Sequence, residues 1–402
     1  MPAVRRAWRA GRSCRRECAV LRAYRKHCSR ECSIEIESTW CVAMKDNLPW
    51  LDWLRFLAAF CVTLAHARGL LFVEYSSLQA DSQSFLVGIF FAATRLGYEA
   101  VVVFFVLSGY LVGGRAFERS RAGQFRGSDY ALDRITRIFL PLIPAIIFTW
   151  LVQALVGVPD GISIVLGNLF ALQGLLVPVM DSNGPLWSLS YEIWFYLLCG
   201  GVATIVSRAG FVPFFLVVCS FIVFSVLEPY LLFSWLLGVA VYIWKPTGRS
   251  VFALLAAVTL ASTGIVCLQL GSEGAMQITW TFLPSKGFST LILSAGIALL
   301  ISQLVLMSTP RSGLKVFFYK QGTILADFSY TLYLVHYPLF VFAVPMLGKS
   351  DQVTSMELLA LCGMMLVCLI FSYVFYLAFE RPTMTVRRLC RRLLVRRPQK
   401  LA

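Results

Sequence analysis

The sequence predicts an all-α, polytopic integral membrane protein with about ten transmembrane helices. The first observation is composition: of 402 residues, 58% are hydrophobic and 14% are charged, which is far more apolar than a soluble domain. The second is the recurrence of apolar stretches along the chain, since a helix of about 20 residues crosses the hydrocarbon core of a bilayer. The third is the clustering of basic residues between alternate stretches, which sets an orientation in the membrane.

Ten spans follow from hydropathy. Residues 162–178 are also apolar, but Gly167, Asn168 and Gln173 favour a re-entrant or interfacial segment there. With the N-terminus inside, the inner loops and the tail hold 20 lysines and arginines, and the outer loops hold three. The positive-inside rule therefore places both termini in the cytoplasm. The spans cover about residues 50–73, 94–113, 138–157, 187–206, 211–227, 230–244, 250–270, 287–307, 324–344 and 357–379.

Three parts are expected along the chain. Residues 1–43 form a basic, cysteine-rich leader, either disordered or an over-extended start, without the apolar core of a secretory signal. Residues 44–382 form the transmembrane domain, and residues 383–402 form a basic cytoplasmic tail. The net charge of +15 lies mostly in the leader, the tail and the inner loops, which indicates topology and lipid contact rather than nucleic-acid binding. The cysteine spacing in the leader matches no common zinc pattern, so no metal site is expected.

The first span carries charged residues that are costly inside a bilayer and therefore candidates for function. Arg55 and His66 are eleven residues apart, which places them on one helical stripe about 16 Å apart. Ala59 and Val62 lie between them, so the stripe suggests a groove for a long ligand with an anionic head. Arg68 follows His66. The alternative is a histidine bonded to a neighbouring helix and an arginine that snorkels to the interface.

Two arginines precede the third span. Arg134 and Arg137 are three residues apart and so share a face of a helix at its cytoplasmic start. Forked guanidinium donors in this arrangement suit phosphate groups. The alternative is ordinary positive charge on an inner loop.

The fourth span begins with Ser188 and Glu192, which are one turn apart. Glu192 lies about 8 Å below the outer end of its span, and His66 lies about 10 Å below the outer end of the first. A carboxylate beside an imidazole raises its basicity, as a general base requires. The alternative is a glutamate bonded to backbone or to a serine within the bundle.

The ninth span places Tyr330, Tyr333 and His336 just before Pro338. Proline frees backbone carbonyls in a membrane helix, and a nearby polar side chain can satisfy them. For His336 this structural role is the favoured interpretation.

Six motifs follow one another from about Leu48 to Pro382: LDWLRFLAAFCVTLAHA, VVVFFVLSGYLV, DRITRIFLPL, PLWSLSYEIWFYLL, FSYTLYLVHYPLF and FERP. In these residues and in their order, the chain resembles the membrane-bound acyltransferase family 3, the O-acyltransferases of bacterial polysaccharides. One departure is Ile193, which stands where many members of that family carry a second acidic residue.

The resemblance implies transfer of an acyl group, usually acetyl from acetyl-CoA, to a hydroxyl of an exported glycan or glycolipid. The enzyme would reside in the bacterial inner membrane and use acyl-CoA as a substrate, without a bound cofactor. We expect His66 to act as general base and Glu192 to orient it. The expected ligands of the acyl-CoA phosphates are Arg55, Arg134 and Arg137, and additional candidates for the site are Arg68, Ser188, Tyr333 and His336.

Two other classes of protein remain open. In a proton-coupled secondary transporter, His66, Glu192 and Arg68 would form a relay. Many transporter folds contain repeated halves, and no such repeat is evident here. A transporter also has no need for a cytoplasmic arginine pair aligned with an intramembrane histidine. The last alternative is a non-catalytic bundle that scaffolds glycan machinery.

Overall fold

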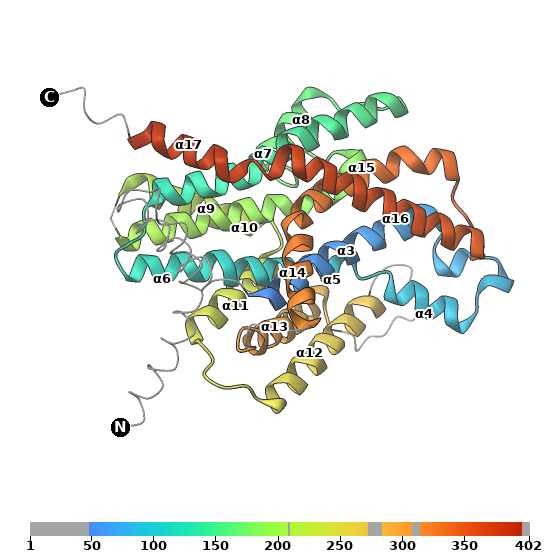
Figure 1. Ribbon diagram of the computed structural model, residues 1–402, viewed down its shortest axis with the longest axis horizontal. Helices are drawn as coiled ribbons and strands as arrows, with labels where there is room; N and C mark the ends of the chain where they lie inside the picture. Colours follow the sequence, from blue (N-terminus) through green and yellow to red (C-terminus); the bar gives the residue numbers. More distant parts are fainter. Residues whose placement is uncertain (1–47, 208–209, 272–283, 308–313, 396–402) are drawn as a thin grey trace, which may run out of the picture. The chain divides into compact units, whose positions relative to one another are not determined.

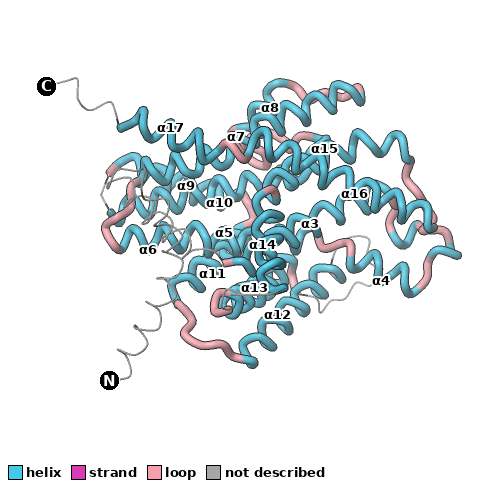
Figure 2. The backbone as a smooth tube through the Cα atoms, viewed as in Figure 1, coloured by secondary structure: helices cyan, strands magenta, loops and turns pink. Residues whose placement is uncertain are grey.

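The computed structural model describes residues 48–207, 210–271, 284–307 and 314–395, and these are almost entirely helical (Figures 1 and 2). The leader expected over residues 1–43 lies outside the described residues. Within them, eight helices are long and apolar enough to cross a membrane, and two shorter apolar helices accompany them. The prediction of an all-α, polytopic membrane protein is confirmed.

The helices follow the expected spans in order. Six of the long spans are single helices: α3 (Pro49–Leu71), α7 (Gly127–Val156), α9 (Trp187–Ser207), α12 (Val251–Leu270), α13 (Lys286–Leu304) and α15 (Ser329–Leu347). One span is composite and joins α4 (Phe85–Ala93), α5 (Gly97–Ser108), a π-helical turn (Gly109–Gly114) and α6 (Arg115–Arg121). The last is α16 (Ser355–Phe375), which continues into α17 (Thr383–Val395). The two shorter helices are α10 (Phe211–Val226) and α11 (Pro229–Trp244), and the remaining ones are α8 (Ile162–Leu169) and α14 (Leu314–Asp327).

Helix α3 lies inside the bundle, where it contacts α5, α14, α15 and α16 (Figure 1). Its buried residues Phe56, Ala59 and Leu71 join a hydrophobic cluster with Phe328 of the α14–α15 turn and Met364 of α16. Helix α12 is peripheral, since it packs mainly on α13 and only 17% of its apolar window is buried. The charged residues of α3 are therefore carried by a central helix.

Small residues let α5 and α11 approach closely. A Cβ atom on Gly109 would lie 1.9 Å from the Trp235 carbonyl oxygen, and one on Gly238 would lie 2.0 Å from the Val106 carbonyl oxygen. Neither position tolerates a larger side chain without separating the helices. The glycines of the second span thus serve close packing, as small residues commonly do between membrane helices.

Three boundaries differ from the hydropathy estimate. Helix α7 begins at Gly127, eleven residues before the expected span, because its first turns are polar and hydropathy detects only the apolar part. The expected ninth span began at residue 324, but α14 ends at Asp327 and α15 begins at Ser329, with the non-helical Phe328 between them. The segment at 162–178 forms α8 and a turn, in which the buried Gln173 side chain donates to the Leu186 carbonyl (2.9 Å).

Candidate active site

His66 lines a cavity of about 560 Å³. In the orientation predicted by the positive-inside rule, the cavity lies at the outer ends of the helices, since it is built from the end of α3 and the starts of α5, α9, α11 and α13. The imidazole contacts the rings of His336 (5.4 Å between centroids) and Tyr337 (5.1 Å), but it makes no hydrogen bond to any described residue. Its ring nitrogens are therefore free for a substrate. The cavity is also lined by Tyr98, Trp187, Glu228, Lys286 and Tyr333.

His336 is fully buried beside His66. Its Nδ1 lies 3.0 Å from the Leu332 carbonyl oxygen, so a neutral ring carries its proton on Nδ1 and donates it there. Its Nε2 is buried without a hydrogen-bond partner among the described residues. The carbonyl that Pro338 leaves without its helical donor is that of Leu334, and Asn183 donates to that one (3.0 Å), so His336 does not fill the role expected beside this proline. The ring contact places His336 in the same site as His66.

Tyr333 connects this site to the start of α9. Its hydroxyl donates to the Pro185 carbonyl (2.6 Å), and Ser188 Oγ lies 2.6 Å from the same hydroxyl. Because the single phenolic proton is engaged by Pro185, Ser188 is the donor in the second bond. Tyr333 also faces the cavity that holds His66. The structure therefore brings together four residues from the sequence analysis: His66, His336, Tyr333 and Ser188.

Glu192 does not contact His66. Its Oε1 accepts a hydrogen bond of 2.5 Å from Tyr196, four residues further along α9, and no hydrogen bond joins it to His66 within the described residues. Ser108 Oγ donates to the Tyr196 hydroxyl (3.2 Å). Tyr196 was not singled out in the sequence, although its spacing of four from Glu192 was a usable signal.

Of the three candidate arginines, Arg55 and Arg137 come together although they lie on α3 and α7. The two side chains are near enough to interact electrostatically. Arg137 is exposed, and Arg55 is 23% exposed and pairs with Asp52 at 3.7 Å. Asp327 lies near both arginines as well. Two neighbouring cations, one of them exposed, form a candidate anion site at the inner ends of the helices.

Arg134 points elsewhere. Its guanidinium lies over the rings of Tyr196 (5.3 Å) and Tyr130 (6.0 Å), and it lines an apolar cavity of about 300 Å³ between α7, α9 and α10. Its Nε is buried, and no described residue offers it a hydrogen-bond acceptor. Tyr196 thus lies between Arg134 and Glu192, because its ring contacts the guanidinium and its hydroxyl donates to the carboxylate.

The remaining predicted features are packed rather than open. Arg68 is 5% exposed and lies 4.9 Å over the Phe91 ring. It faces away from the cavity because residues two apart on a helix diverge by about 200°. Ala59 and Val62 are 0% and 1% exposed and line neither cavity. The stripe between Arg55 and His66 is thus filled by neighbouring side chains.

The outer cavity also contains residues that the sequence analysis missed. Tyr98 and Trp187 stack at 6.2 Å with nearly parallel planes. Lys286 pairs with Glu228 (3.0 Å) and lies 4.8 Å over the Tyr98 ring. These residues come from the starts of α5, α9, α11 and α13, which no local pattern connects.

Comparisons with known proteins identify the family. The sequence profile of the acyltransferase domain of the acyltransferase 3 family matches residues 48–377, which is most of the chain. No curated protein and no solved structure matches. The matched range runs from the start of α3 to just beyond the end of α16, so it leaves out α17, and it contains all the candidate residues of both sites. The chain therefore belongs to the acyltransferase 3 family and is a membrane O-acyltransferase.

Proposed function

We propose that this protein transfers an acetyl group from acetyl-CoA to a hydroxyl of an exported glycan or glycolipid, with His66 as general base. The observation that carries the proposal is the unbonded state of the His66 imidazole at a cavity. Its imidazole lies in a cavity of about 560 Å³ and makes no hydrogen bond to the described protein. An unengaged imidazole beside an open cavity is suited to accept a substrate proton. We further propose a bacterial inner membrane as its location.

The donor binds from the cytoplasmic side. Coenzyme A carries several phosphates, and forked guanidinium donors bind phosphate through paired hydrogen bonds. Arg55 and Arg137 supply two such groups that are near enough to interact electrostatically, and Arg134 lies one turn before Arg137 on α7. The thioester arm must then reach His66 through the packed stripe on α3. Donor binding therefore requires side chains to move between the two sites.

The chemical step uses His66 to deprotonate the acceptor hydroxyl. The oxygen attacks the thioester carbonyl, the C–S bond breaks, and the departing thiolate of coenzyme A takes the proton from the imidazolium. His66 thus ends the cycle neutral, and the products are the acetyl ester and free coenzyme A. For Glu192 to orient His66, it must leave Tyr196, which holds it in the described structure.

The acceptor enters the outer cavity. Stacked aromatic rings with a few charged groups are typical of small-molecule sites, where aromatic faces supply contact area and polar groups fix orientation. Tyr98 and Trp187 provide the rings, and Glu228 and Lys286 provide the polar groups. A sugar ring has both apolar faces and hydroxyl edges, so this lining is suited to it.

The test is acetyl transfer by the purified full chain. Labelled acetyl-CoA is supplied to the protein with a panel of glycans and glycosides, and labelled product is measured for the parent and for His66→Ala. We expect product from the parent and loss of about 10²-fold or more in the variant. Uptake of a solute into vesicles without any acetyl transfer or hydrolysis would instead establish a transporter.

A further inference from the structure

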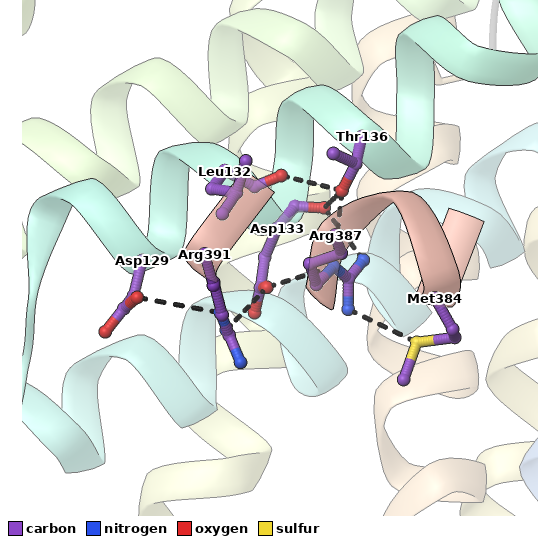
Figure 3. Close-up of polar contacts among 7 residues, drawn as sticks. All are labelled: Asp129, Leu132, Asp133, Thr136, Met384, Arg387 and Arg391. Atoms are coloured by element: carbon purple, nitrogen blue, oxygen red, sulfur yellow. Dashed lines mark hydrogen bonds and ion pairs between the residues drawn. The ribbon is translucent and has the colours of Figure 1, made fainter. Parts of the chain in front are cut away.

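Two arginines tie the C-terminal helix α17 to the start of α7 (Figure 3). Arg387 Nε lies 3.1 Å from Asp133 Oδ1, and the same side chain donates to Thr136 Oγ1 and to the Asp133 carbonyl, both at 3.2 Å. Arg391 bridges two carboxylates that are one helical turn apart. Its Nη2 lies 3.0 Å from Asp133, and its Nε lies 3.7 Å from Asp129.

This contact determines the partner of Asp133. Asp133 and Arg137 are four residues apart on α7, the spacing at which an acid and a base pair on a helix surface. In the structure, Asp133 is taken by α17 instead. Arg137 is exposed and makes no hydrogen bond or ion pair with any described residue. Its five N–H donors therefore remain available to an anion.

We propose that Arg387 and Arg391 are positioning residues for the donor site. They neutralise Asp129 and Asp133 and thereby keep Arg137 free to bind phosphate. The inference rests on the proposed function, because it takes acyl-CoA as the anion that Arg137 binds. Without α17, Asp133 turns to Arg137 and competes with the phosphates for its guanidinium.

The electrostatics of α7 favour this interpretation. Asp129 and Asp133 carry like charges four residues apart, an arrangement that destabilises a helix unless a cation lies between them, and Arg391 occupies that place. Arg387 also lies near Arg134 and Arg137. Arg137 already lies near Asp327 and the buried Glu380, so a free carboxylate at Asp133 would add to the negative charge that a polyanionic ligand must overcome.

The experiment measures acetyl-CoA affinity by calorimetry, together with KM and kcat, for the purified full chain. The double variant Arg387→Ala/Arg391→Ala should raise the Kd and KM for acetyl-CoA about two- to fivefold, the range of exposed ion pairs, with kcat unchanged. The matched control is Arg388→Ala/Arg392→Ala. It removes the same charge from the same helix, but these two exposed arginines make no ion pair with the described residues, so affinity should stay at the parent level.

A rescue separates charge neutralisation from a mechanical clamp. Adding Asp133→Asn to the double variant removes the competing carboxylate and should restore parent affinity. If α17 only holds α7 in place, asparagine restores nothing, and the proposal is wrong. Equal affinity of the parent and the double variant would also overturn it, while leaving acyl-CoA binding intact.

A second variant covers the case in which the double variant does not fold. Asp133→Asn alone breaks the two ion pairs of Asp133 and leaves the one between Arg391 and Asp129, yet it should bind acetyl-CoA as tightly as the parent or more tightly. Weaker binding by this variant would contradict the proposal. A parent protein that binds no acetyl-CoA would overturn the proposed function, and this inference with it.

Discussion

The imidazole rings of His66 and His336 lie 5.4 Å apart between centroids, with 32° between their planes. They differ in what they bind: His336 is bonded to the Leu332 carbonyl, whereas His66 has no hydrogen-bond partner among the described residues and lines the outer cavity. One ring is thus bonded to the helix backbone, and the other is unbonded at the cavity. Replacing each histidine should accordingly have a different effect.

His66→Ala should reduce acetyl transfer by about 10²- to 10⁴-fold, the usual contribution of a general base. The affinity for acetyl-CoA and the melting temperature should change little, because no hydrogen bond of the described protein is lost. His336→Ala should instead lower the melting temperature, since it removes a buried ring together with the hydrogen bond from that ring to the Leu332 carbonyl. Initial transfer rates and thermal unfolding in detergent check both. A His66→Ala enzyme with parent activity would eliminate the proposed base.

Arg137→Ala should weaken acetyl-CoA binding about tenfold or more, because charge-assisted hydrogen bonds contribute about 1.5–3 kcal/mol each. Arg137→Lys should recover only part of the loss, since an ammonium lacks the planar fork. Calorimetric titration of the purified variants is the measurement. Arg126→Ala is the matched control, because Arg126 is also an exposed cation just before α7. If Arg126→Ala weakens binding as much as Arg137→Ala, the effect is general charge rather than a site.

Glu192→Gln should lower kcat at least about tenfold, the scale of one charge-assisted hydrogen bond, and leave the affinity for acetyl-CoA unchanged. Glutamine can still accept from Tyr196, so the fold should survive. Tyr196→Phe provides the contrast: it frees the carboxylate from its hydrogen bond while keeping the ring under Arg134. If Glu192 must leave Tyr196 to orient His66, this variant should keep or exceed parent kcat. A large loss in Tyr196→Phe would show that the bound form of Glu192 is the functional one.

These contacts show what the sequence could and could not predict. Helical periodicity and hydropathy predicted the spans and which residues share a helix face, because both depend on local spacing along one helix. The same reasoning placed Glu192 and His66 at one depth but not on facing sides. Which way a side chain turns depends on how its helix packs against others, and Glu192 turns toward Tyr196.

The inner site shows the same limit. Arg134 and Arg137 share one helix face by spacing, yet Arg137 lies near Arg55 of α3, whereas Arg134 lies over Tyr196 of α9. A spacing of three residues leaves an angle of about 60° between two side chains around the helix axis. That angle is large enough for the two side chains to contact different neighbouring helices. The contact of α17 with α7 could not be predicted either, since its polar contacts join residues about 250 positions apart in sequence.

Trp187→Leu tests the acceptor side of the site. Trp187 stacks on Tyr98, and removing its aromatic face while keeping an apolar side chain should lower kcat/KM for a glycoside acceptor. We expect about a two- to tenfold loss, since an aromatic pair contributes about 0.5–1.5 kcal/mol beyond its area. KM for acetyl-CoA should stay at the parent value, because the arginines lie at the opposite ends of the helices. The measurement is transfer of labelled acetyl to a soluble glycoside, with hydrolysis of acetyl-CoA measured in parallel.

Trp244→Leu is the matched control, since that tryptophan is 66% exposed at the end of α11 and lines neither cavity. If Trp187→Leu slows hydrolysis and transfer equally, the residue supports the catalytic step or the fold, and the acceptor must bind elsewhere.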